Sequence, residues 1–228
     1  MFRPTTFTVG LLIATALNGF AQNQVDTDRV IISVRDQKMM LVQNGTAVAT
    51  YPVSTSKYGV GDGWGTWATP TGFFQVAQKI GDYAPIGAVF HNRRWTGEVL
   101  QPNAPGRDPI VTRIIWLRGL EASNEHAYRR CIYIHGTPQE KFIGRPASYG
   151  CIRMKSSDVA ALYNQLSPGA FVQIVPDRLP KLPKGKLRPA PVEQMMATTS
   201  PAATVKPATT PERKARTPVI LGSIVGGG

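Results

Sequence analysis

Short apolar runs separated by turn residues recur through most of this chain, and they constrain its fold class more than any other feature. The runs are rich in Val, Ile and Phe, and Gln43-Asn44-Gly45 between two of them is a hairpin signal. Together they predict strands over residues 30–34, 38–42, 46–53, 73–77, 113–117, 131–134 and 170–175. We therefore expect a mainly β domain over residues 29–175.

Helical spacing is found in one segment, which follows Ser156 and Ser157. Either serine can cap the helix, and Val159 and Leu162 begin an apolar stripe. The connection over residues 81–109 has little periodicity but holds aromatic and basic residues. Long connections in compact domains are often functional, so we expect a long capping loop there.

The two ends of the chain differ in composition from its middle. Residues 1–21 carry a basic residue, an apolar run and small residues near Ala21, which predicts a secretory signal peptide and a periplasmic or other extracytoplasmic location. Residues 176–228 are rich in Pro, Ala and Thr and hold nine Lys/Arg against three Asp/Glu, half of the net charge of +12. This composition is typical of a disordered basic tail, which can attract anionic polymers. The expected compartment argues against nucleic acid as a partner.

The chain has two cysteines, Cys131 and Cys151, so it is no disulfide scaffold. Cys131 lies in an apolar run, and we expect it to pack in the core. A bond between the two would remove the thiol of Cys151, and we expect both to be free. One Cys beside one His lacks the further ligands that zinc needs, so we predict no metal site and no cofactor.

The segment from His135 to Cys151 holds a complete set of groups for nucleophilic catalysis. Strand alternation turns His135 away from the neighbouring Ile134, and Gly136 then lets the chain turn. The following loop is long enough to return Cys151 to the strand end. An imidazole beside a thiol stabilises the thiolate, so we expect a depressed pKa for Cys151, the nucleophile, with His135 as base and proton donor.

The residues around Cys151 can complete the site. Gly150 permits an exposed turn in which the N–H groups of Tyr149, Gly150 or Cys151 could stabilise an oxyanion. Arg153, two positions further on, could bind a substrate carboxylate. A carbonyl group that orients His135 is also needed, and the sequence does not identify it.

This segment resembles the signature of the L,D-transpeptidase catalytic domain family (YkuD-like), a His-Gly followed about fifteen residues later by Ser/Thr-x-Gly-Cys-x-Arg. The matching positions are His135-Gly136, Ser148, Gly150-Cys151 and Arg153, and residues 52–56 and 69–74 are similar to further segments of the family. The resemblance covers residues 29–175 and implies a β-sandwich-like fold with one or two short helices and a capping loop. Many members have His where this chain has Tyr149, a change that we do not expect to abolish the thiol chemistry.

The resemblance also implies a reaction on peptidoglycan stem peptides. Cys151 would attack the carbonyl of the third residue, the terminal D-Ala would leave, and an amine would resolve the thioester. Gly136, Ser148, Tyr149, Gly150 and Arg153 would support the site in what we expect to be a monomer. The acceptor stays open between a stem peptide, an envelope protein, a D-amino acid and water. A cell-wall cysteine peptidase and a non-enzymatic wall-binding module are the alternative interpretations.

Overall fold

The computed structural model describes residues 28–189 of the 228-residue chain. The predicted signal peptide, residues 1–21, and the part of the predicted tail after residue 189 lie outside the described residues.

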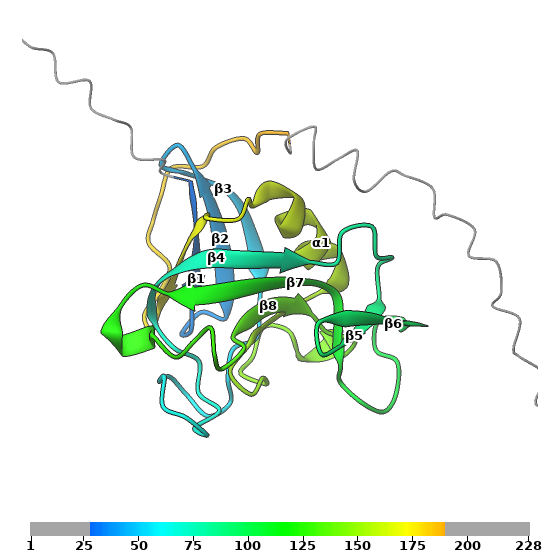
Figure 1. The fold of residues 1–228 in the computed structure, drawn as a ribbon. Coiled ribbons are helices and arrows are strands. Elements are labelled where there is room, and N and C mark those ends of the chain that lie inside the picture. Colours follow the sequence, from blue (N-terminus) through cyan, green and yellow to red (C-terminus); the bar gives the residue numbers. More distant parts are fainter. Residues whose placement is uncertain (1–27, 190–228) are drawn as a thin grey trace, which may run out of the picture.

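Within this range ten strands form one hydrogen-bonded sheet (Figure 1). In chain order they are β1 (Arg29–Ser33), β2 (Lys38–Gln43), β3 (Thr46–Pro52), β4 (Gly72–Ile80), β5 (Ala88–His91), β6 (Arg94–Val99), β7 (Ile110–Gly119), β8 (Tyr133–Gly136), β9 (Ile152–Met154) and β10 (Phe171–Val175). Their spatial order is β3-β2-β1-β10-β4-β7-β5-β6, and β7 also pairs with β8, which pairs with β9. The mainly β class is confirmed.

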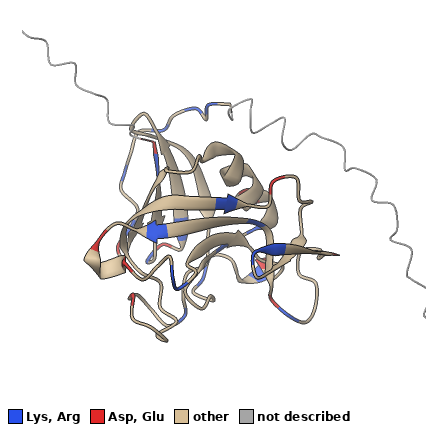
Figure 2. Cartoon of the chain, in the orientation of Figure 1, with Lys and Arg blue, Asp and Glu red and all other residues tan. Residues whose placement is uncertain are grey.

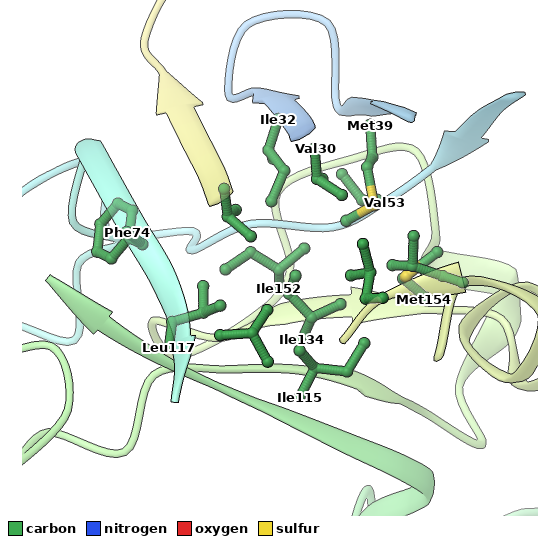
Figure 3. Close-up of a cluster of buried hydrophobic side chains, with 14 of the residues drawn as sticks. Val30, Ile32, Met39, Val53, Phe74, Ile115, Leu117, Ile134, Ile152 and Met154 are labelled. Atoms are coloured by element: carbon green, nitrogen blue, oxygen red, sulfur yellow. The ribbon is translucent and has the colours of Figure 1, made fainter. Parts of the chain in front are cut away.

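The main core lies where the first strands of the sheet face β7, β8 and β9. Figure 3 shows Val30 and Ile32 on one side of this core and Ile115, Ile134 and Ile152 on the other. All five side chains are 2% exposed or less. The curled sheet therefore encloses its apolar faces as a sandwich does, because each strand contributes alternate residues to the core.

Helix α1 (Ser156–Gln165) covers this core beside β7 and β8 and buries Val159 and Leu162. Its N-cap differs from the prediction. Ser156 is the first helical residue, the N-cap is Lys155, and the N-cap side chain makes no capping hydrogen bond. The N–H of Ser156 instead donates to Glu140 Oε1 at 2.8 Å. A carboxylate from the preceding 3-10 turn η2 (Glu140–Phe142) thus satisfies one of the free donors at the positive end of the helix.

The predicted capping loop, residues 81–109, contains a β-hairpin that the sequence did not indicate. β5 and β6 pair around Asn92 and Arg93, and β5 also pairs with β7, so the hairpin projects from the end of β7 (Figure 1). β6 is exposed along most of its length and lacks alternating apolar residues, which explains why no strand was predicted.

The domain continues past the predicted boundary at residue 176. Leu179 and Leu182 pack against a small apolar cluster on the outer side of β1 and β2. Ala47 of β3 exchanges hydrogen bonds with Pro183 O and Gly185 N, at 2.8 and 2.9 Å. Residues 176–189 thus follow the edge of the sheet, whereas the sequence predicted a disordered tail from residue 176.

Candidate active site

The candidate site lies on the face of β8 and β9 that points away from the main core. β8 and β9 are parallel, with Ile134 opposite Ile152 and His135 opposite Arg153. Ile134 and Ile152 belong to the main core, so alternation turns His135 and Arg153 to the other face. Cys151 immediately precedes β9 and shares that face, where a second apolar cluster contains it and Tyr133.

His135 is almost fully buried, with 5% of its surface exposed. Its Nδ1 lies 2.8 Å from the carbonyl oxygen of Gly136, the next residue. When Nδ1 carries the proton it donates to this carbonyl, and Nε2 is left as a base. The main chain of Gly136 therefore supplies the orienting acceptor that the sequence did not identify.

The thiol of Cys151 contacts two main-chain groups beside β8. The N–H of Tyr133 donates to Sγ at 3.5 Å, and Sγ donates to Cys131 O at 3.3 Å. Its position is therefore set by the backbone that leads into β8.

Burial sets the protonation state of both groups in the resting site. It raises the pKa of the Cys151 thiol to about 11, against the N–H of Tyr133 and the charge of Arg153, which lower it. Burial also lowers the pKa of His135 to about 4, although the Gly136 carbonyl favours the protonated ring. The pair is thus a neutral thiol and a neutral imidazole at pH 7. The direction of this shift is opposite to the depressed pKa expected for Cys151 from the sequence, because the sequence pattern did not show that the two groups are buried.

The turn before Cys151 is held by Ser148 and requires Gly150. Ser148 is fully buried, and its Oγ donates to Cys151 O at 2.5 Å and accepts from Gly150 N at 3.2 Å. Gly150 has φ of +120°, where side chains are disfavoured, and an added Cβ would lie 3.3 Å from Ala68 O. With Gly150 N–H engaged, the N–H groups of Tyr149 and Cys151 are the remaining oxyanion donors of this turn.

Two polar residues that the prediction did not place in the site also fix it. Thr69 Oγ1 donates to Gly150 O at 2.9 Å, and Thr69 is fully buried. Asp108 Oδ2 binds Arg153 Nη2 at 2.7 Å, and its Oδ1 accepts from Thr137 Oγ1 at 2.5 Å. The similar segment 69–74 gave a signal for Thr69, whereas nothing in the sequence singled out Asp108.

Arg153 differs in its surroundings from the predicted substrate contact. Besides Asp108, its Nη1 donates to Ala147 O at 3.2 Å, and 11% of the side chain is exposed. A carboxylate and a carbonyl of the chain itself therefore already bind the guanidinium.

Tyr149 lies at the outer rim of the turn and is half exposed. Its ring contacts Tyr58 and Trp67 at centroid distances of 5.8 and 5.9 Å, and Lys57 Nζ donates to its hydroxyl at 3.2 Å. We call these four residues, Lys57, Tyr58, Trp67 and Tyr149, the rim cluster.

Cys131 departs from the expected strand position. It lies in the turn before β8 with φ of +58° and is partly exposed, and it packs against the edge of the second apolar cluster rather than inside the core. Both cysteines are free in the structure.

Residues 28–189 contain no group of three or more His, Cys, Asp or Glu side chains placed to hold a metal ion. They also contain no helix of the length and apolarity needed to cross a membrane.

The sequence of this domain matches a known family. The profile of the L,D-transpeptidase catalytic domain, YkuD, matches residues 27–174. The chain belongs to this family, which confirms the resemblance seen in the sequence.

Individual relatives are distant. The chain is 27% identical over 150 residues to the probable L,D-transpeptidase YcfS of Escherichia coli K12, covering 64% of this chain and 43% of that protein. It is 27% identical over 148 residues to the putative L,D-transpeptidase YqjB of Bacillus subtilis 168, covering 65% of this chain and 71% of that protein. The chain thus spans less than half of the Escherichia coli relative.

Similar solved structures are also L,D-transpeptidases. One, from Mycobacterium tuberculosis H37Rv, has a TM-score of 0.43 and 16% identity, covering 65% of this chain and 57% of that chain. Another is LdtMt1 in complex with imipenem, with a TM-score of 0.42 and 19% identity, covering 66% and 59%.

Proposed function

We propose that this protein is an extracytoplasmic cysteine L,D-transpeptidase that acts on peptidoglycan stem peptides. The observation that carries the proposal is the placement of Cys151 and His135 on one face of two adjacent parallel strands, in a chain of this family. The extracytoplasmic location follows from the predicted signal peptide, since peptidoglycan lies outside the cytoplasm.

The neutral resting pair supports a mechanism in which proton transfer accompanies attack. Cys151 Sγ attacks the carbonyl carbon of the donor peptide as His135 Nε2 takes the thiol proton, and the N–H groups of the turn bind the oxyanion. The tetrahedral intermediate collapses to a thioester, and the leaving D-alanine amine takes the proton from His135. An acceptor amine then attacks the thioester, gives its proton to His135, and releases Cys151 as a thiol.

The acceptor decides the product class. A stem-peptide amine gives a cross-link, an envelope-protein amine gives attachment of that protein, and water gives hydrolysis, as in a cell-wall cysteine peptidase. Which of these acceptors reaches the thioester is an experimental question.

Intact-mass spectrometry of the purified chain tests this proposal. Incubation with a tetrapeptide stem or a carbapenem is expected to add one acyl group at Cys151. Cys151→Ala should form no adduct, whereas Cys131→Ala, which removes the other free thiol, should still form one. A wild-type protein that forms no adduct, or a Cys151→Ala variant with full activity, would favour the wall-binding module instead.

A further inference from the structure

The tip of the β5–β6 hairpin holds an arginine in an unfavourable backbone conformation. His91 pairs with Arg94, so Asn92 and Arg93 form a two-residue loop, with φ of +48° and +63°. Such loops favour Gly at the second position, because a side chain there crowds the backbone. Backbone strain of this kind is typical of functional positions, so the Arg93 side chain is the feature to examine.

Arg93 reaches from the hairpin to the face of the sheet that holds the thiol. Its guanidinium lies 4.9 Å from the centre of the Trp116 ring, and Nη1 donates to Tyr133 Oη at 3.4 Å. Nη1 is also 4.0 Å from Cys131 Sγ, and Cys131 O accepts the hydrogen bond from Cys151 Sγ. Cys131 therefore lies between the Arg93 guanidinium and the Cys151 thiol.

Arg93 contacts the Trp116 ring and the Tyr133 hydroxyl but has no carboxylate partner among residues 28–189. Ion pairs within residues 28–189 include Arg107, Arg130, Arg153, Arg178 and Arg188, but none includes Arg93. The side chain is exposed, and Figure 2 shows basic residues on the hairpin where it projects from the body. By contrast, Arg153 is already paired with Asp108.

We propose that Arg93 binds the terminal carboxylate of the donor peptide and so selects peptides with a free carboxyl end. This inference rests on the proposed function and adds a specificity-determining contact to it. A guanidinium presents parallel donors to a carboxylate, and the Trp116 and Tyr133 contacts hold its plane in place before substrate binds. Carboxylate recognition thus moves from Arg153, predicted from the sequence, to a residue of the capping hairpin.

The first test compares a tetrapeptide stem with its C-terminal amide as donors. The wild-type protein is expected to acylate with a KM about tenfold lower for the free acid. Arg93→Gln should remove most of this preference and leave the amide unaffected, and Arg93→Lys should retain part of it. Arg94→Gln, the adjacent exposed arginine, should behave as the wild type.

A second test needs no transpeptidase activity. Iodoacetate and iodoacetamide differ by a carboxylate and an amide, and peptide mapping gives the rate of each at Cys151. Arg93→Gln should lower the iodoacetate-to-iodoacetamide rate ratio about threefold, and Arg94→Gln should not. An unchanged ratio together with an unchanged acid preference overturns the role of Arg93 while the proposed function stands. Absence of acylation by any donor removes the proposed function, and the alkylation ratio still reports on Arg93.

Discussion

Arg153 Nη2 and Asp108 Oδ2 form an ion pair at 2.7 Å beside the candidate base, and both side chains are largely buried. Arg153 lies opposite His135 in the β8–β9 register, and the two charges act on the imidazole in opposite directions. Because Asp108 also accepts from Thr137 Oγ1, it connects the segment before β7 to the end of β8. The pair therefore fixes the strand end that carries the site.

Asp108→Asn should destabilise the protein. The substitution leaves the Arg153 charge largely buried without its counter-ion, which costs about 3 kcal/mol. Urea unfolding measures this loss. Glu98→Gln, which breaks the exposed pair with Arg107, is the control and should cost less than about 1 kcal/mol. Equal small losses in both variants would show that the Arg153 pair contributes little.

The alkylation rate of Cys151 should increase with pH well above neutrality. Burial raises the pKa of this thiol to about 11, so the reactive thiolate fraction grows roughly tenfold per pH unit from pH 7 to 10. Iodoacetamide labelling of the Cys131→Ala variant measures the alkylation rate of Cys151 alone. A rate that is already constant above pH 7 would instead support the thiolate-imidazolium pair predicted from the sequence.

Local patterns were sufficient to predict most strands and the helix, and they single out His135 and Cys151 as the candidate reactive residues. Short apolar runs bounded by turn residues define β1 and β2, which are buried on both faces, and β10 buries alternate side chains. The signals for His135 and Cys151 are also local. His135 lies near the end of a strand and Cys151 directly precedes one, and each has a glycine beside it. These features need no knowledge of distant contacts.

The remaining features depend on contacts far apart in the sequence. Asp108 could have paired with any basic residue, and its choice of Arg153 follows from how the chain enters β7. β6 is exposed and has no apolar alternation, so pairing with β5 alone defines it. The burial of Cys151 follows from the second apolar cluster, which packs against it and includes Ala88 and Phe90 of the hairpin.

His135 should make the stability of the protein fall in acid. Burial lowers its pKa to about 4 from about 6.5, so the folded state binds fewer protons than the unfolded chain in this range. The contribution of His135 to the free energy of unfolding is fully present above pH 6.5. It falls by about 3 kcal/mol as the pH decreases to 4. Urea unfolding of wild type and His135→Gln measures the difference, and the variant should lose this part of the slope. His91→Gln, an exposed histidine, should keep it, and an equal slope in all three would exclude His135 as the cause.

Tyr149 should affect substrate binding more than thiol reactivity. It belongs to the exposed rim cluster, where its ring contacts Tyr58 and Trp67, and its contacts do not include Cys151 Sγ. Tyr149→Ala is expected to raise the KM for a stem peptide about fivefold, the loss of one aromatic contact. Its iodoacetamide rate at Cys151 should stay within about twofold of the wild type. A large drop in that rate would instead place Tyr149 in the thiol chemistry.

Gly136→Ala should weaken both the fold and the acylation step. An added Cβ would lie 2.7 Å from Val111 O and 3.2 Å from Thr112 Cβ, on the irregular stretch of β7 that faces the end of β8. Overpacking against backbone costs about 1–3 kcal/mol, and the shift would also move the carbonyl that binds His135 Nδ1. Thermal unfolding and single-turnover acylation should therefore both decline. Gly106→Ala is the control, because its Cβ would enter open space at φ of +99°. Gly106→Ala should destabilise the backbone but leave the acylation rate unchanged. An equal loss of acylation in both variants would mean that general destabilisation, and not the position of His135, limits the reaction.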